Sequence, residues 1–286
     1  MRRNLYKIIV AALLIALFYA VKIYRSPAPF LTSVTSPKQS EGGLKIHFLD
    51  VGQGDATLIQ TPENKLILVD GGPDGKVLMS RLSPFFLFGE CKLEAIILTH
   101  PDSDHEAGLL EALKRCQVNQ VFANTTNCTL FNCQQFNALN AHVTSIYQND
   151  RYEIGTLGIT VLNPPRTQNL NDNDTNSDSV VTELEFGQAR VLLTGDATIQ
   201  NLKNIPEESI TILKVPHHGS VNNFDPTLWE EIRPQLAVVS VGKNNYGQPS
   251  PKVLGEATIL GTKVLRTDEV GDVNVDLGID GNWVLE

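Results

Sequence analysis

The chain has 286 residues, 42% of them hydrophobic, and a formal net charge of −9 at pH 7. This length and apolar content are sufficient for one large domain with a buried core. The negative charge argues against a nonspecific nucleic-acid coat, because Lys and Arg supply most of the affinity for phosphate. It does not exclude a metal-mediated phosphodiester site, where the ion itself supplies positive charge.

The N-terminus predicts a membrane-directing segment over residues 1–25. Arg2, Arg3 and Lys7 precede an uncharged apolar run over residues 8–21, the order found in signal sequences and signal anchors. No small-x-small cleavage site follows, so an uncleaved signal anchor is favoured over a cleaved signal peptide. A buried N-terminal helix of a cytosolic protein is the remaining alternative. With the basic residues on the N-terminal side, we expect the rest of the chain outside the cytoplasm, at the cell surface or in the periplasm.

Residues 26–43 are rich in Pro, Ser, Thr and Gly and predict a linker, and residues 44–286 predict one folded domain. Strands are expected at 44–51, 57–61, 66–72, 93–98, 118–123, 152–154, 158–162, 180–186, 190–193, 210–215, 236–241, 263–266, 272–277 and 283–285. Helices are expected at 77–88, 109–115, 128–139, 227–232 and 251–260. The first three strands are joined by short turns and predict an antiparallel sheet. Strands followed by strand–helix pairs, twice over, predict two sheets between layers of helices.

The four cysteines are Cys91, Cys116, Cys128 and Cys133, and their spacing is not that of a zinc finger. Disulfides persist outside the cytoplasm, so these residues fit the outward location. Four cysteines allow three pairings. We expect the sequential one, Cys91 with Cys116 and Cys128 with Cys133.

The first candidate metal motif directly follows the short apolar run 96–98. It places His100, Asp102, Asp104 and His105 within six residues, ahead of the helix expected from Leu109. Imidazole and carboxylate ligands together suit zinc, manganese or iron. The alternative is a polar loop in which these residues occur by chance.

Two further motifs also come where a strand ends. Asp196 follows the strand 190–193, and His217 and His218 follow the strand 210–215. Taken singly, an Asp after a strand is often a helix cap, and a His pair is often polar surface. Because all three motifs lie at strand ends, we expect them to meet at one edge of the sandwich.

Seven segments of the chain resemble the metallo-β-lactamase superfamily, and within it the nuclease-like C-terminal domain of the ComEC family of DNA-uptake competence proteins. They are FLDVGQGDA (48–56), LVDGG (68–72), LTHPDSDHEAGL (98–109), NSDSVV (176–181), LLTGDA (192–197), KVPHHGS (214–220) and SVGKNNYGQPSPKVL (240–254). The resemblance covers residues 44 to about 280. It implies a four-layer αββα sandwich with one or two divalent ions, zinc or manganese, where the loops of the two sheets meet.

The resemblance also implies roles for individual residues. The implied metal ligands are His100, Asp102, Asp104, His105, Asp196 and one of His217 and His218, with His217 preferred and Asp196 bridging two ions. The residues implied in catalysis are Asp104, His218 and Lys214. Lys214 would stabilise charge on the phosphate, or would be an exposed strand residue instead. Residues expected to support the site or contact the substrate are Asp55, Asp70, Ser179, Ser220, Lys243, Asn244 and Tyr246. Asp55 and Asp70 are equally consistent with turn carboxylates that bond backbone amides.

The sequence departs from the motifs of these families in four places. Asp102 and the segment 176–179 lack the His of the broad superfamily but agree with ComEC-like proteins. Gln248 stands where those proteins usually have His, and Asn223 where a second Ser is common. The extra carboxylate of Asp102 shifts the balance from zinc toward manganese, and the last two changes leave substrate and rate open.

The implied protein is a membrane-tethered, metal-dependent phosphodiesterase or nuclease that acts on single-stranded DNA or another phosphodiester. One alternative is a hydrolase of the same fold for another phosphoester, such as phosphorylcholine, or for another ester. The second alternative is a non-catalytic binding module that keeps the metal for stability. A role in DNA uptake requires a channel partner, because the sequence contains none of the many spans that a channel needs.

Overall fold

The computed structural model describes residues 42–86, 89–124, 136, 138–139, 143–166, 175–203, 205 and 209–286. The chain from Ser40 to Glu286 forms one compact unit. The expected anchor, nearly all of the expected linker, most of the helix expected at 128–139, and the Cys128–Cys133 pair lie outside the described residues. Within the described part, no helix has the length and apolar character needed to cross a membrane.

The first sheet has eight strands in the order β15-β14-β1-β2-β3-β4-β5-β6. Its strands are β1 (Leu44–Phe48), β2 (Thr57–Gln60), β3 (Leu66–Val69), β4 (Lys92–Leu98), β5 (Gln117–Ala123), β6 (Val143–Ser145), β14 (Val273–Leu277) and β15 (Trp283–Leu285). The expected antiparallel pairing of β1, β2 and β3 is confirmed. The C-terminal hairpin extends this sheet, with Leu44 opposite Leu277.

The second sheet has seven strands in the order β13-β12-β11-β10-β9-β8-β7. Its strands are β7 (Arg151–Ile154), β8 (Leu157–Asn163), β9 (Val181–Phe186), β10 (Ala189–Leu193), β11 (Ile212–Lys214), β12 (Leu236–Val239) and β13 (Lys263–Arg266). Strands β10 to β13 run parallel, as do β3 to β6 in the first sheet. Both sheets are therefore mixed.

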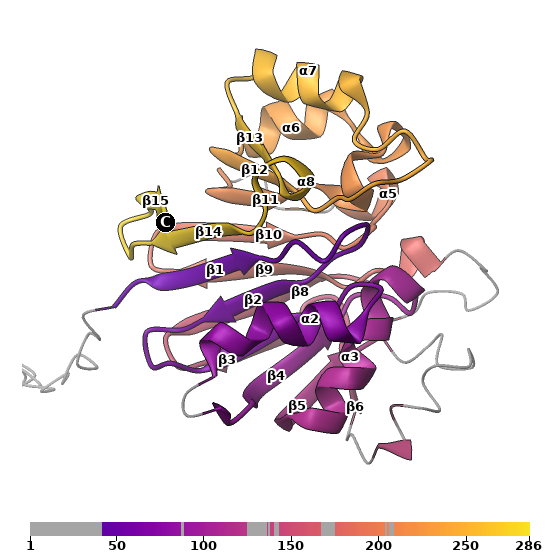
Figure 1. The fold of residues 1–286 in the computed structure, drawn as a ribbon. Coiled ribbons are helices and arrows are strands. Elements are labelled where there is room, and N and C mark those ends of the chain that lie inside the picture. Colours follow the sequence, from indigo (N-terminus) through magenta and orange to yellow (C-terminus); the bar gives the residue numbers. More distant parts are fainter. Residues whose placement is uncertain are drawn as a thin grey trace, which may run out of the picture. The chain divides into compact units, whose positions relative to one another are not determined.

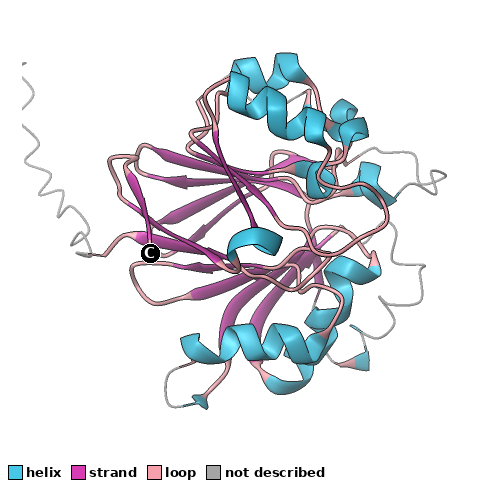
Figure 2. Ribbon diagram, turned by 45° about the horizontal axis from the view of Figure 1, so that its top comes forward, coloured by secondary structure: helices cyan, strands magenta, loops and turns pink. Residues whose placement is uncertain are grey.

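Helices cover the outer faces of both sheets, with the two sheets packed against each other between them (Figures 1 and 2). On the first sheet lie α2 (Gly75–Leu82) and α3 (Ser103–Arg115), whose Leu78 and Leu109 pack against strand residues such as Ile96. On the second lie α5 (Ile199–Leu202), α6 (Pro226–Ile232) and α7 (Pro251–Ile259); the short α8 (Thr267–Val270) follows β13. The apolar residues between the sheets form a third buried cluster. The expected αββα layering is thus confirmed for the described part.

The start of α3 differs from the expectation. The helix begins at Ser103, six residues before the expected start at Leu109. The acidic residues Asp104 and Glu106 lie in its first turn, where the helix dipole favours negative charge. Asp104 and His105 are therefore fixed by helical backbone and do not lie in a loop.

Several short elements were not expected from the sequence. They are β6, α5, α8 and the 3₁₀ helices η4 (Thr175–Asp178), η5 (Pro216–Gly219) and η6 (Val221–Asn223), whereas the 3₁₀ helix η1 (Ser83–Phe85) lies within the helix expected at 77–88. Each is only three or four residues long, too short to produce a recognisable periodicity.

The parallel strands bring the candidate motifs to one edge. Asp70 follows β3, His100 follows β4, Asp196 follows β10 and His218 follows β11. Because these strands run parallel within each sheet, their carboxyl ends lie together. The two sheets thus present their motifs to a common rim.

Candidate metal centre

Asp70 anchors the first motif from below. Its backbone adopts φ 57° at the end of β3, a left-handed conformation that Asp tolerates. Its Oδ1 accepts from the backbone N–H of Thr99 at 2.8 Å, and its Oδ2 accepts from the Thr99 hydroxyl at 2.7 Å. The same Oδ2 accepts from Nδ1 of His105 at 2.8 Å. A carboxylate on one ring nitrogen is the usual arrangement behind a metal-binding histidine.

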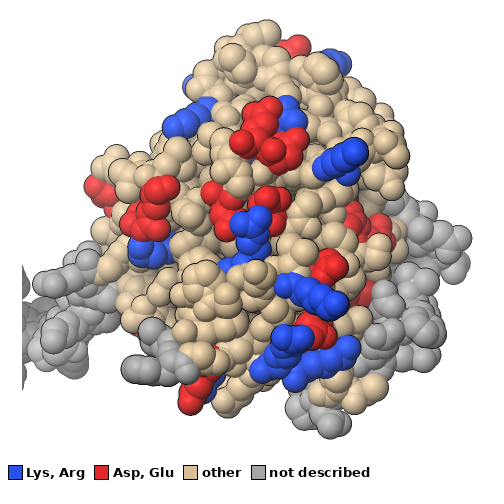
Figure 3. All heavy atoms as spheres, in the orientation of Figure 1, with Lys and Arg blue, Asp and Glu red and all other residues tan. Residues whose placement is uncertain are grey.

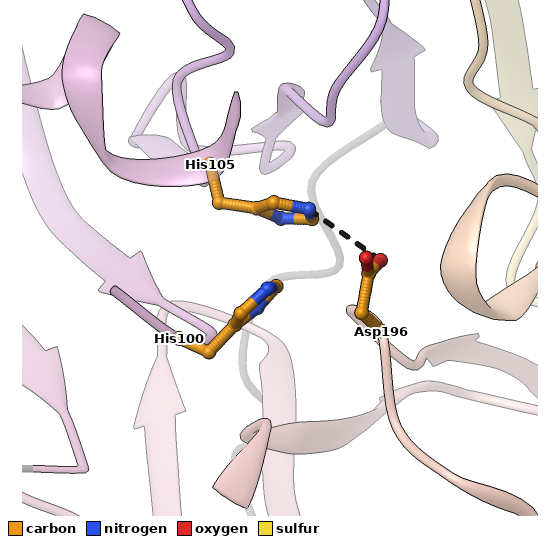
Figure 4. A group of neighbouring side chains, drawn as sticks. All are labelled: His100, His105 and Asp196. Carbon is orange, nitrogen blue, oxygen red and sulfur yellow. Dashed lines mark ion pairs between the residues drawn. The ribbon is translucent and has the colours of Figure 1, made fainter. Parts of the chain in front are cut away.

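His100 is oriented through the same hydroxyl group. Thr99 Oγ1 has already donated its hydrogen to Asp70, so it accepts from Nδ1 of His100 at 3.0 Å. The Nε2 atoms of His100 and His105 are buried and have no hydrogen-bond partner among the described residues. Both rings therefore turn the same nitrogen toward Asp196 (Figure 4).

His218 reaches the cluster from the second sheet. Its Nδ1 donates to the backbone oxygen of Ser240 at 2.8 Å, and a carbonyl can only accept, so Nδ1 carries hydrogen. Its Nε2 lies 3.4 Å from Oδ2 of Asp104 and 3.5 Å from Oδ2 of Asp196. It has no hydrogen-bond partner in the part of the chain that the structure describes. His218 is the third buried imidazole with Nε2 facing the centre.

His217 lies closer to the solvent. Its side chain is 28% exposed, and its Nε2 lies 3.7 Å from Oδ2 of Asp196. Asn223 donates through Nδ2 to the backbone oxygens of Asp196 and Ala197, which leaves its Oδ1 to accept from Nδ1 of His217 at 3.1 Å. Asn223, one of the departures noted in the sequence, thus connects His217 to the segment that carries Asp196.

Asp196 is the centre of the arrangement. Its Oδ1 is 3.4 Å from Nε2 of His105, the interaction drawn in Figure 4. Groups of ligand atoms within 4.8 Å of one another combine it with His100 and His105 on one side, and with Asp55 and His218 on the other. A third such group joins Asp104, His105 and His218. Asp196 is therefore the carboxylate that two of these groups share.

Lys214 and Asp55 form a buried ion pair beside the cluster. The Lys214 ammonium also donates to the backbone oxygen of Gly195 at 3.2 Å and lies 3.9 Å from Oδ1 of Asp196. Lys214 is only 2% exposed, so the alternative of an exposed strand residue is wrong. Every residue of the strand β11 is buried. A single Lys at the end of so short a strand gives no sign of this burial in the sequence.

Opposite charges set the protonation of the buried groups. Burial disfavours the charged imidazoles, but the carboxylates of Asp196 and Asp55 outweigh it and raise the pKa of His218 to about 9. The pKa of His105 is raised well above its ordinary value for the same reason. Burial also opposes ionisation of Asp196, yet His218 and His105 lower its pKa well below the ordinary value. Protonated imidazoles therefore neutralise the carboxylates.

The residues fit a divalent cation. Nε2 of three buried histidines and Oδ1 of Asp196 face one another and have no hydrogen-bond partner within the described ranges. Buried polar atoms without partners are uncommon in folded proteins and call for an explanation. A divalent ion would coordinate these atoms and displace the imidazole protons, and the mixture of nitrogen and carboxylate ligands suits zinc, manganese or iron.

The other expected site residues lie around this cluster. Asp102 is 42% exposed, with Oδ2 at 3.6 Å from Nε2 of His100, and the Thr175 hydroxyl donates to its Oδ1. Ser179 Oγ accepts from the backbone N–H of Asp196 at 3.3 Å. Ser220 caps η6. The structure thus brings Asp102 to the rim and Ser179 behind Asp196, while the Ser220 hydroxyl accepts from the nearby backbone N–H of Asn222.

Lys243, Asn244 and Tyr246 belong to a loop after β12. Asn244 bonds backbone groups within this loop, and the Tyr246 side chain is exposed. Thr99, whose hydroxyl links Asp70 to His100, is not among the site residues expected from the sequence. The one indication of its role in the sequence is its position between the apolar run 96–98 and His100.

Fold and cluster together define the class: an αββα sandwich that gathers histidine and aspartate ligands where its two sheets meet. Residues 49–243 match the family model of the metallo-beta-lactamase superfamily, and the chain belongs to this superfamily. The expected resemblance to ComEC-like competence proteins is confirmed by distant relatives.

Two curated relatives and one solved structure illustrate the similarity. ComE operon protein 3 of Bacillus subtilis is 28% identical over 270 residues, which cover 85% of this chain and 34% of that protein. Recombination protein 2 of Haemophilus influenzae is 31% identical over 238 residues, 81% of this chain and 29% of that protein. The chain therefore spans about a third of these relatives. The metallo-beta-lactamase fold protein YhfI from Bacillus subtilis superposes with a TM-score of 0.56 at 14% identity, covering 81% of this chain and 99% of that one, which supports the fold alone.

Proposed function

We propose that this protein is a divalent-metal-dependent phosphodiesterase, and that its substrate is single-stranded DNA. The observation that carries the proposal is the convergence of three buried Nε2 atoms on Asp196 in a relative of competence and recombination proteins. A divalent ion in such a site lowers the pKa of water and stabilises negative charge on phosphate oxygens. Zinc and manganese are both compatible with the ligands.

The residues of the chain take distinct parts in this proposal. His100, His105 and Asp196 would hold one ion, and Asp104, Asp196 and His218 a second. His217 and Asp102 stand at the exposed rim, where a substrate can reach them. Lys214 points into the protein and holds Asp55, so we assign it a positioning role instead of a contact with the phosphate.

Charges on the surface bear on how DNA would be held. On the face drawn in Figure 3, basic and acidic side chains lie interspersed, and the net charge is −9. Broad electrostatic attraction is therefore weak. We expect affinity to depend on the metal and on few contacts near it, among them Tyr246, which is 79% exposed and offers a ring for stacking on a base.

The proposed location is extracytoplasmic, with residues 1–25 as membrane anchor and a channel protein as partner for DNA uptake. The disulfide between Cys91 and Cys116 supports a location outside the reducing cytoplasm. It also agrees with the first half of the expected pairing.

The decisive assay incubates the purified full chain with labelled single-stranded DNA and Mn²⁺ or Zn²⁺. We expect cleavage that EDTA abolishes and that the double variant Asp104→Ala/His105→Ala lacks. If the wild-type protein cleaves the DNA no faster than that variant, the proposed nuclease activity is ruled out. Hydrolysis of bis-p-nitrophenyl phosphate without DNA cleavage would instead indicate another phosphoester, and metal retention without any turnover a binding module.

A further inference from the structure

We propose that the side-chain amide of Gln248 donates a hydrogen bond to a phosphate oxygen of the substrate, and that Gln53 is the positioning residue that aims it. The identity of the ligand, a phosphodiester, rests on the proposed function. The placement and orientation of the amide rest on contacts within the chain.

Gln248 lies beside the candidate metal centre. The backbone N–H of Ser250 donates to the oxygen of Gly219 at 2.9 Å, and a Cβ on Gly219 would come within 2.7 Å of Cβ of Pro249. The loop therefore packs on the residue that follows His218. On its other side, a Cβ on Gly242 would clash with the backbone of Gln53, so the loop also packs on the turn that leads to Asp55.

The segments on either side of Gln248 both enter the metal centre. Oδ1 of Asp55 lies 3.4 Å from Nδ1 of His218, so the two segments on which the loop packs also contact each other. Gln248 bonds Gln53 in the turn that leads to Asp55, and it lies two residues before Ser250, which bonds Gly219 next to His218. Gln248 therefore stands at the rim of the same cluster.

The orientation of the Gln248 amide follows from a backbone group. The N–H of Gly242 can only donate, so the atom of Gln53 that faces it at 3.3 Å is the acceptor Oε1. The Nε2 of Gln53 is then the donor of its 3.0 Å hydrogen bond to Gln248. That bond must reach Oε1 of Gln248. The Nε2 of Gln248 is left to donate elsewhere, and it has no hydrogen bond to any described residue.

The backbone of Gln248 is held as firmly as its side chain. Asn244 Nδ2 donates to the oxygen of Gln248 at 2.7 Å and to that of Gly242 at 2.9 Å. Asn244 Oδ1 accepts from the N–H of Gln248 at 3.2 Å and from that of Tyr246 at 3.0 Å. A donor fixed at both ends loses little conformational freedom when it binds a ligand.

A neutral amide donor suits this position chemically. The cluster carries the carboxylates of Asp55, Asp104 and Asp196, which repel a phosphate wherever the cation does not neutralise them. The amide adds an N–H donor for an anionic oxygen and stays uncharged at every working pH. Hydrogen bonds to a charged partner are stronger than neutral ones and correspond to about 10- to 100-fold in affinity.

The test compares the full chain with Gln248→Glu, an isosteric change that keeps an acceptor for Gln53 but removes the donor and adds negative charge. Calorimetric titration of the metal-loaded protein with inorganic phosphate gives Kd, and bis-p-nitrophenyl phosphate gives KM and kcat. We expect Gln248→Glu to raise Kd and KM by about 10- to 100-fold, with bound metal and Tm unchanged. Gln248→Ala, which removes both the donor and the acceptor for Gln53 without adding charge, should raise them about 10-fold. Gln53→Ala should raise them by less, because the Gln248 amide remains but loses its anchor.

Gln60→Glu, the same change in charge on β2, is the matched control and should leave Kd and KM unchanged. If Gln248→Glu leaves both ester hydrolysis and phosphate binding unchanged, the role of Gln248 is overturned, but the proposed phosphodiesterase activity is not. An equal effect of Gln60→Glu would also overturn it, because net charge would then suffice. Weaker phosphate binding in Gln248→Glu and Gln248→Ala, in a protein that hydrolyses no phosphodiester, would support the amide donor and refute the proposed function. A wild-type protein that neither binds phosphate nor hydrolyses the ester would refute both.

Discussion

Asp70 and His105 form a buried hydrogen bond, from Nδ1 to Oδ2 at 2.8 Å, that fixes the direction of the imidazole. The same carboxylate accepts from the backbone and the hydroxyl of Thr99. One residue at the end of β3 therefore sets the position of the strand end that precedes His100 and the ring of His105. Asp70 joins β3, β4 and α3 into one support for the metal centre.

We predict that Asp70→Asn weakens metal binding by about 10- to 100-fold, the usual effect of losing a carboxylate behind a metal-binding histidine. Asn tolerates the left-handed backbone of this position. Its amide nitrogen, however, only donates and can accept from neither Thr99 Oγ1 nor His105 Nδ1. Competition with a metal indicator dye measures the change in Kd.

Asp74→Asn is the matched control for this measurement. Asp74 caps α2, accepting from the backbone N–H of Lys76 and Val77, and Asn serves equally well as a cap. Metal affinity should stay as in the wild type. An Asp70→Asn protein that binds metal as tightly as Asp74→Asn would contradict the role assigned to Asp70.

The sequence predicted most of the candidate centre because its ligand types come in short motifs at strand ends. His100, His105 and Asp196 lie together as expected. Sequence alone does not show which of His217 and His218 turns inward. Both residues adopt positive φ, 50° and 52°, and no side-chain periodicity applies to such a backbone. The structure buries His218, whereas the sequence favours His217 as the ligand. Which of the two binds the metal stays a prediction.

Contacts between distant parts of the chain account for the other differences. Lys214 lies in a run that is short and apolar, and only the packing of β11 between β10 and β12 shows that it is buried. The pairing of β14 with β1 joins residues more than 200 positions apart. Gln53 and Gln248 likewise meet across 195 positions. No local pattern encodes such pairs.

Metal binding should stabilise the fold measurably. A ligand that binds only the native state adds about 2.7 kcal/mol at a free concentration of 100 times its Kd. Adding Mn²⁺ or Zn²⁺ to EDTA-treated protein should therefore raise Tm, as measured by differential scanning calorimetry. The double variant Asp104→Ala/His105→Ala should show no such rise. An equal rise in that variant would place the bound ion elsewhere.

Gly108 allows α3 to lie close to the turn after β3. A Cβ at this position would clash with the carbonyl oxygen of Gly71, and the Gly108 N–H donates to the oxygen of Gly72 at 2.9 Å. We predict that Gly108→Ala lowers the free energy of unfolding by about 1–3 kcal/mol, although Ala is the better helix former. Urea denaturation followed by circular dichroism measures it.

Gly255 in α7 provides the matched helix control, because a Cβ there meets nothing within 4 Å. Gly255→Ala should stabilise the protein by about 0.5–1 kcal/mol through helix propensity alone. If both substitutions stabilise the protein, the close approach of α3 to the turn is not what restricts position 108.

The disulfide between Cys91 and Cys116 closes a loop with a sequence separation of 25. Loop-closure entropy predicts that its removal costs about 3 kcal/mol of unfolding free energy. Cys116 follows the last turn of α3, whereas Asp104 and His105 lie in its first. Cys91→Ala/Cys116→Ala should therefore unfold at lower urea concentration yet bind metal with unchanged stoichiometry. Loss of metal from the folded variant would contradict this separation.

Tyr246 should distinguish a polymeric substrate from a small one. Its side chain is 79% exposed, on the loop that Asn244 holds rigid, and stacking of one base on an aromatic ring contributes about 1–3 kcal/mol. Tyr246→Ala should raise KM for a single-stranded oligonucleotide by about 5- to 100-fold. Hydrolysis of bis-p-nitrophenyl phosphate should be unchanged, and Tyr246→Phe, which keeps the ring, should behave as wild type on both. If Tyr246→Ala slows the hydrolysis of both substrates equally, the residue supports the loop and does not bind a base.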